Sequence, residues 1–455
     1  MKVVFAIPHY DTHFRVPPLG VGYLSAVLKR IGVETLIIEG VRDNLSNQQI
    51  IKMIDDFAPD AVCISCISAY YNEAKELAKV VKKEGYKLVL GGVHPTFMPY
   101  QTLVDTGADY VICGEGEIAI EKLAQNGFIN NGIQGVYSLS DLENPDTLTQ
   151  RAEMVEDLDE IPFPDWDQLK LTEYEGSALG TFVKAYPIGN ICSSRGCNYA
   201  CTFCSSTNFY CNRIRYRSAE NVFEEMKLLV EKYGVREFHF MEDNLISDRA
   251  RIMKLCDLII DSNLDIYWYP SNGIRADMLD EELANKMVES GCYCVAFGIE
   301  SAEQKILDNI GKGETVETIE NAVNIAAKAG LEIHGAFVLG LPGETKESIR
   351  KTIDFAKRIP INRALFTVLD ICPGSTLWKK YRNTPLSSFE SYATVVMEPN
   401  GLTAKDIISA QKRAMVEFYF RPKVFWSIVK TIKWCELRFI IKRIFKYVFI
   451  KQKKH

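Results

Sequence analysis

The sequence lacks the features of a membrane-spanning or nucleic-acid-binding protein. No apolar run reaches the roughly 18 uninterrupted residues that suggest a spanning helix. Basic residues are not in excess, because 53 Lys and Arg stand against 59 Asp and Glu, and the net charge of −6 does not suggest a nucleic-acid partner. The chain begins with MKVVFAIPHY, which has the pattern of a strand and not of a signal peptide. We therefore expect a cytoplasmic protein, and its 455 residues suggest two or three domains.

The composition is also unlike that of a disulfide-stabilised scaffold. The 13 cysteines are spread over a long chain that is 47% hydrophobic and 25% charged. In a reducing compartment, clustered cysteines indicate metal or redox chemistry, and scattered ones indicate core packing. Cys63 and Cys66 fall within an apolar stretch, and a spacing of three directs them to opposite faces of a strand. We assign both to the core.

The first 125 residues alternate short apolar runs with helical patterns. The expected strands are Lys2–Ile7, Glu34–Ile38, Ala61–Ile67, Lys87–Leu90 and Tyr110–Ile112. The expected helices are Gly20–Ile31, Asn47–Asp56, Asn72–Glu84 and Ile118–Gln125. This alternation predicts an α/β fold for residues 1–125, a Rossmann-like doubly wound parallel sheet. Its ligand would lie beyond the carboxyl ends of the strands.

The rest of the chain divides into three parts. Residues 126–186 carry turn signals and are expected to form a connector. Residues 187–375 resume the strand–helix alternation with six units, which predicts a partial (β/α)6 barrel with its site at the carboxyl ends of the strands. The six expected strands are Ile188–Cys192, Glu237–Met241, Ile266–Tyr269, Val295–Ile299, Ile333–Leu339 and Leu365–Leu369. Residues 376–455 are expected to be helical, with a basic amphipathic tail.

Cys197, Cys201 and Cys204 form the strongest motif, just after the first barrel strand. Three thiolates at spacings of four and three residues can each ligate one iron of a 4Fe–4S cluster, which leaves the fourth iron open. A structural zinc site would require a fourth protein ligand, and the sequence does not indicate one clearly. Cys192 and Cys211 flank the loop and are possible rival ligands.

The C-x3-C-x-aromatic-C pattern, with Phe203 as its aromatic, resembles the signature of the radical S-adenosylmethionine (SAM) superfamily. The resemblance implies reductive cleavage of SAM at the cluster to a 5′-deoxyadenosyl radical, with an electron donor such as flavodoxin or ferredoxin. It also implies SAM contacts at the ends of later barrel strands. The residues that this resemblance assigns to SAM are Phe203, Glu242, Asp243, Gly298, Glu300, Ser301 and Gly340.

A second resemblance lies in the N-terminal domain. Its glycine-containing loops are similar to those of the cobalamin-binding domain that precedes the barrel in methylating radical SAM enzymes, and glycines permit close approach to a flat macrocycle. The residues assigned to cobalamin are Pro18, Leu19, Gly20, Ser65, Gly91, Gly92, His94, Gly114 and Glu115. The alternative is a Rossmann-like domain that serves only for docking.

Two histidines are candidates for a lower cobalt ligand. His94 could ligate cobalt, but its neighbours in the glycine-containing loop suggest that it forms part of the wall of the site. His13 lies in Asp-Thr-His-Phe-Arg-Val16, which partly resembles the D-x-H-x-x-G motif, although Val16 replaces its glycine. We expect cobalt without a protein imidazole beneath it.

Together the resemblances imply a cobalamin-dependent radical SAM enzyme. The leading interpretation is a C-methyltransferase that acts on an unreactive carbon through the 5′-deoxyadenosyl radical and methylcobalamin. The alternatives are a cyclase or rearrangement enzyme that does not methylate, a methylthiotransferase, and a cobalamin sensor without catalysis. The methylthiotransferase is disfavoured because the chain ends in a helical pattern.

The basic tail is physically distinct from the rest of the chain. From Lys412 to His455 there are 13 Lys and Arg against 2 acidic residues. Apolar and basic residues recur at helical spacing over residues 418–455, which suits peripheral contact with an anionic membrane and suggests a lipid-like or other small-molecule substrate. The alternative is a helix that packs on the barrel.

Overall fold

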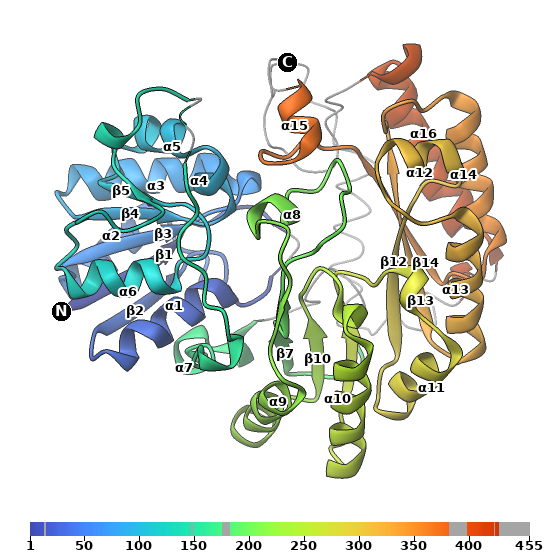
Figure 1. Cartoon of the computed structure of the whole chain (residues 1–455), viewed down its shortest axis with the longest axis horizontal. Helices are drawn as coiled ribbons and strands as arrows, with labels where there is room; N and C mark the ends of the chain where they lie inside the picture. Colours follow the sequence, from blue (N-terminus) through green and yellow to red (C-terminus); the bar gives the residue numbers. More distant parts are fainter. Residues whose placement is uncertain are drawn as a thin grey trace.

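The computed structural model describes residues 1–12, 15–145, 147, 149–174, 183–381, 398–422 and 424–426. Two α/β domains lie side by side, with the N-terminal domain in blue and the barrel in green to orange (Figure 1). Within the described residues, none of the helices combines the length and the apolarity that crossing a bilayer requires.

The N-terminal domain is built on a six-stranded sheet. Its strands are β1 (Lys2–Ile7), β2 (Glu34–Glu39), β3 (Ala61–Ser65), β4 (Leu88–Gly91), β5 (Tyr110–Ile112) and β6 (Val136–Tyr137), in the order β2-β1-β3-β4-β5-β6. The first five are parallel, as expected, and β6 is antiparallel to β5. The segment expected to be a connector therefore contributes the last strand of this sheet.

Helices cover both faces of this sheet because its strands are apolar on both sides. They are α1 (Leu19–Arg30), α2 (Asn47–Phe57), α3 (Tyr71–Lys83), α4 (Val93–Phe97), α5 (Pro99–Thr106) and α6 (Glu117–Gln125). Val3 and Phe5 of β1 pack with α1 and α6, whereas Val4 and Ala6 pack with α2, α3 and α5. Cys63 and Cys66 belong to opposite sides of the sheet, so their core assignment is confirmed.

The second domain is the partial barrel. Its strands are β7 (Ile188–Ile191), β10 (Glu237–Phe240), β11 (Tyr267–Pro270), β12 (Cys294–Glu300), β13 (Glu332–Leu339) and β14 (Arg363–Val368). They form two parallel three-stranded sheets, β11-β10-β7 and β12-β13-β14. Isolated parallel bridges, Trp268 with Cys292 and Ile274 with Phe297, join β11 to β12, so the six strands run in chain order round the barrel.

The barrel helices begin where the sequence places a capping residue. They are α9 (Ala219–Tyr233), α10 (Arg249–Ser262), α11 (Glu281–Glu289), α12 (Gln304–Asn309), α13 (Val316–Lys328) and α14 (Lys346–Arg358). Side chains that accept a hydrogen bond from the first turn cap five of them, namely Ser218, Asp248, Asp280, Thr315 and Thr345. These caps fix the helix starts and therefore the loops that follow each strand.

Five further short elements and one longer helix lie outside these two sets. They are α7 (Trp166–Leu169), β8 (Ser194–Arg195), α8 (Ser206–Phe209), β9 (Arg215–Tyr216), α15 (Thr376–Tyr381) and α16 (Ala404–Tyr419). α16 packs on β14, where Phe418 is buried and the Tyr419 hydroxyl donates to the Ala364 carbonyl at 2.8 Å. The start of the expected tail is therefore part of the barrel, whereas residues 427–455 lie outside the described residues.

Candidate functional site

The three motif cysteines lie in one loop between β8 and α8, beyond the carboxyl end of β7. Backbone bonds anchor this loop to the barrel: the Thr202 N–H donates to Ile310 at 2.8 Å, and the Leu377 N–H donates to Thr202 at 2.9 Å. Gly311 has φ +66, and a Cβ there would lie 2.8 Å from the Ala200 carbonyl. The loop is thus held against α15 and against the segment that follows α12.

The three thiols are partly buried and close enough to influence one another. Burial raises the pKa of Cys204 to about 11, and the neighbouring Cys201 and Cys197 add to the rise. The Ser206 N–H donates to the Cys204 Sγ at 3.4 Å, a contact of the kind that tunes cluster potentials. Among the described residues, no group of three or more His, Cys, Asp or Glu is arranged to hold a single metal ion. Three interacting thiols in one anchored loop suit the wider span of a 4Fe–4S cluster.

A buried group of charges borders the cysteine loop, and sequence reasoning identified only Glu300 of it. The Lys312 Nζ lies 3.6 Å from Glu300 Oε1 and 3.3 Å from Glu314 Oε2. Burial raises the pKa of Cys201, and the Lys312 ammonium opposes that rise. Arg275 stacks on the Tyr199 ring at 3.5 Å within the same loop. The only signal for Lys312 was its place between two glycines after a barrel strand.

Two predicted SAM residues lie at the end of β10, next to the cysteine loop. Glu242 Oε1 accepts a hydrogen bond from the Ser193 hydroxyl, whereas its buried Oε2 has no hydrogen-bond partner among the described residues. Asp243 accepts a hydrogen bond from Ser206. Burial raises the pKa of both carboxyls. An unsatisfied buried carboxylate oxygen fits a charged donor, such as the ammonium of SAM.

The remaining predicted SAM residues divide into two groups. Glu300 lies at a bulge with φ +61, and a Cβ on Gly298 would come within 2.6 Å of its Oε1, so glycine there lets Glu300 turn toward Lys312. Phe203 is half-buried against the core. Ser301 instead lies 3.3 Å from Thr352 on α14, and the Gly340 N–H donates to Glu344 at 2.6 Å. The structure therefore gathers Glu242, Asp243 and Glu300 at the loop, while Ser301 and Gly340 make contacts elsewhere.

The carboxyl ends of the N-terminal strands face the cysteine loop. Phe97, after β4, contacts Phe209 of α8 with the ring centroids 6.3 Å apart, and α8 lies between the two domains in Figure 1. A Cβ on Gly20 or Gly91 would meet no atom within 4 Å. Those two glycines leave open space of the kind that cobalamin requires.

Gly92 is constrained by the chain itself. It has φ +106, and a Cβ there would lie 2.5 Å from the Cys66 carbonyl. The close approach that requires glycine at this position is therefore to the backbone after β3. Pro18 precedes α1, Leu19 is its first residue, and Ser65 ends β3, so all three lie at the same end of the sheet.

Two residues assigned to cobalamin make contacts that the sequence did not indicate. The His94 ring is stacked on Tyr71 at 3.8 Å, and its Nδ1 lies 3.0 Å from Ser68 Oγ. Burial lowers the pKa of His94 to about 4, so the imidazole is neutral. Glu115, beside Gly114, is buried in ion pairs with two arginines of the second domain. Both of its carboxylate oxygens are engaged by these arginines, and its assignment to cobalamin stays a prediction. His13 lies outside the described residues.

Two parts of this chain match known domain families. Residues 191–356 match the radical SAM superfamily, and residues 11–124 match the B12 binding domain. The two matches include most of the barrel with its cysteine loop and most of the N-terminal sheet with its glycine loops.

Three relatives span most of this chain. An uncharacterized methyltransferase of Pyrococcus horikoshii is 34% identical over 458 residues, with 97% of both chains covered. Cytidylyl-2-hydroxyethylphosphonate methyltransferase of Streptomyces wedmorensis is 30% identical over 80% of this chain and 77% of that protein. Anaerobic magnesium-protoporphyrin IX monomethyl ester cyclase of Rubrivivax gelatinosus is 27% identical over 93% and 78%.

A solved structure shares the whole fold. The radical SAM methyltransferase TsrM from Kitasatospora setae, with cobalamin and a [4Fe-4S] cluster bound, superposes with a TM-score of 0.72. The match covers 96% of this chain and 89% of TsrM at 16% identity.

Proposed function

This chain belongs to the radical SAM superfamily and carries a B12-binding domain, and on that premise we propose that it is a C-methyltransferase acting on an unreactive carbon. Its cofactors are a 4Fe–4S cluster, SAM and cobalamin. The observation that supports methylation best is the similarity to two proteins named methyltransferases, at 34% identity over 97% of this chain and at 30% identity over 80% of it.

The cofactors, when bound, supply one-electron chemistry and a transferable methyl group. The residues of this chain supply binding, orientation and exclusion of water. Cys197, Cys201 and Cys204 would hold the cluster in the anchored loop. Glu242 would accept a hydrogen bond from the SAM ammonium through its unsatisfied Oε2. Lys312 places a buried positive charge beside Cys201.

The test of methylation follows the fate of SAM in the reconstituted enzyme. A methyltransferase of this type uses one SAM as the methyl donor and a second for hydrogen abstraction. We therefore expect S-adenosylhomocysteine and 5′-deoxyadenosine to accumulate together when the enzyme is incubated without oxygen with host-cell extract. 5′-Deoxyadenosine without S-adenosylhomocysteine contradicts methylation and favours the second candidate.

That second candidate is a ring-forming or rearrangement reaction with the same cofactors. It is favoured by the similarity, over 93% of this chain, to a protein named a cyclase. Its product would differ from the substrate by a new ring or bond and would contain no added carbon.

We also propose that the C-terminal segment contacts an anionic membrane. Four large apolar side chains of the described residues are exposed near the end of α16 and just beyond it, namely Val416, Phe420, Phe425 and Trp426. Exposed aromatic residues followed by a strongly basic segment suit a bilayer surface with acidic lipids. Such a location would bring the enzyme to a lipid-like substrate.

A further inference from the structure

The cysteine loop is closed at its base by a short two-stranded ribbon. β8 and β9 pair in antiparallel register, so that Arg195 lies opposite Arg215. Gly196 has φ +101, and a Cβ there would collide with the Arg213 carbonyl, which explains the glycine. Arg195 stands two residues before Cys197, so any movement of the ribbon moves the cluster ligands.

Arg195 and Arg215 of this ribbon both form ion pairs with carboxylates of the N-terminal domain. Arg215 contacts both oxygens of Glu115, with one of these contacts at 3.1 Å. Arg195 lies 3.2 Å from Glu115 and 2.8 Å from Glu117. All four side chains are between 4% and 11% exposed. We call Glu115, Glu117, Arg195 and Arg215 the interdomain clamp.

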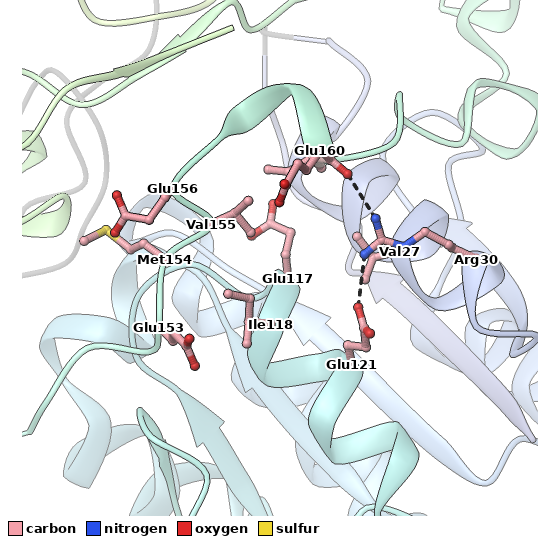
Figure 2. A pocket seen from close by; sticks show the side chains of 11 residues that line it. Val27, Arg30, Glu117, Ile118, Glu121, Glu153, Met154, Val155, Glu156 and Glu160 are labelled. Carbon is pink, nitrogen blue, oxygen red and sulfur yellow. Dashed lines mark hydrogen bonds and ion pairs between the residues drawn. The ribbon is translucent and has the colours of Figure 1, made fainter.

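The cavity behind the clamp belongs to the same junction. It measures about 320 Å³ and lies between α1, α6 and residues 153–161. Figure 2 shows Glu117 on its wall and Arg30 bonded to Glu121 and to the Glu160 backbone. Five carboxylates line this cavity, and four of them form ion pairs, namely Glu117, Glu121, Glu153 and Glu156. The charges here hold segments together and leave no evident cation site.

We propose that the interdomain clamp consists of positioning residues that fix the distance between the 4Fe–4S cluster and the cobalamin. Glu115 and Glu117 follow β5 of the B12-binding domain, and Arg195 and Arg215 frame the cluster loop. Buried, bidentate Arg–carboxylate pairs favour a single geometry. A displacement of either side chain would leave a buried charge without its partner, which is costly away from water. Chemistry that uses both cofactors on one carbon depends on such fixed geometry. The clamp serves methylation and ring formation alike.

The test uses the full-length protein loaded with cobalamin and cluster. Glu115→Gln keeps the shape of the side chain and removes its charge. Pulsed electron paramagnetic resonance then measures how the reduced cluster accelerates the relaxation of cob(II)alamin, which depends on the distance between them. We expect one defined distance in the wild type and loss of that single distance in Glu115→Gln, with iron and cobalamin content unchanged. Arg213→Ala, which removes an exposed ion pair with Glu156 two residues before β9, should keep the wild-type distance.

Two results would overturn the proposal. Loss of cobalamin from Glu115→Gln with the cluster intact would make Glu115 a cobalamin contact. An unchanged distance with a lowered melting temperature would make the clamp merely structural. If Glu115→Gln does not fold, Arg195→Lys keeps the charge without the planar fork, and the same loss of a single distance is expected. A wild-type protein that binds neither cofactor would instead contradict the cofactor assignment itself.

Discussion

At the scale of single residues, the cluster site combines three sequence-local cysteines with charges from distant strands. The cysteines lie within eight residues of one another, whereas Glu242, Arg275 and Lys312 come from the segments that follow β10, β11 and α12. The sequence spacing alone identifies the three cysteines, because they share one loop. The charged residues come together only in the folded barrel, so the sequence does not group them.

Cluster assembly should depend on the three loop cysteines and not on the core cysteines. We expect Cys197→Ala, Cys201→Ala or Cys204→Ala to abolish both the brown absorbance of the reconstituted cluster and 5′-deoxyadenosine formation, since each thiolate ligates one iron. Cys63→Ala is the control, because Cys63 is a buried residue of β3 in the N-terminal sheet. Equal loss in Cys63→Ala, with a normal cluster in Cys201→Ala, would refute the ligand assignment.

Lys312 should raise the reduction potential of the cluster. Reduction adds negative charge, which a nearby ammonium stabilises, so Lys312→Met should shift the midpoint potential to a more negative value. A unit charge at several ångströms is worth about 2 kcal/mol at an effective dielectric constant of about 20, or on the order of 80 mV for one electron. The measurement is a redox titration monitored by electron paramagnetic resonance. Lys305→Met, which removes an exposed lysine from the neighbouring α12, should leave the potential unchanged, and an equal shift in both variants would contradict the assignment.

At the scale of elements, the long periodic segments were predictable, and the short ones were not. The expected strand Lys2–Ile7 coincides with β1, and Asn47–Asp56 differs from α2 by one residue, because continuous apolar runs and helical spacing are local properties. β6 and the β8–β9 ribbon have two residues per strand, so no period could reveal them. Arg215 and Glu115 are 100 residues apart, and this buried pair follows from tertiary packing alone.

The glycines of the N-terminal loops should separate a cobalamin contact from a fold requirement. Gly20→Leu should lower cobalamin stoichiometry with little change in melting temperature, because the side chain would enter open space near the predicted macrocycle. Gly92→Ala should lower the melting temperature first, because its Cβ would meet the Cys66 carbonyl at an unfavourable φ. Cobalamin absorbance per protein and thermal unfolding measure the two effects. Full cobalamin binding by Gly20→Leu would remove Gly20 from the site.

At the scale of the whole molecule, the two domains share one apolar core. It runs from Phe5 of the N-terminal sheet through Trp166 of α7 to Met226 of α9. The Trp166 Nε1 donates to Glu225 Oε1 at 3.0 Å across this junction. The segment expected to be a connector therefore packs between the two domains. The interdomain clamp adds ion pairs to the same contact, next to the cysteine loop.

The part of the tail beyond the barrel should add membrane affinity without contributing to the core. Because Phe418 and Val424 are both buried, the informative truncation removes the residues after Trp426 and keeps α16. We expect the intact protein to sediment with anionic vesicles at low salt and to be partly released at high salt, since charges are screened over about 8 Å at physiological ionic strength. The truncated protein should stay in solution and retain its cluster. An intact protein that ignores the vesicles, or a truncated one that unfolds, would instead make the tail a packing element.

The most direct test of the central claim labels the methyl group of SAM. The reconstituted enzyme is incubated without oxygen with host-cell extract and SAM that carries a trideuterated methyl group, and the extract is then analysed by mass spectrometry. The account predicts a product in which a trideuterated methyl group replaces one hydrogen of the substrate, present with the wild type and absent with Cys201→Ala. Formation of 5′-deoxyadenosine with a product that contains no deuterated methyl would contradict C-methylation.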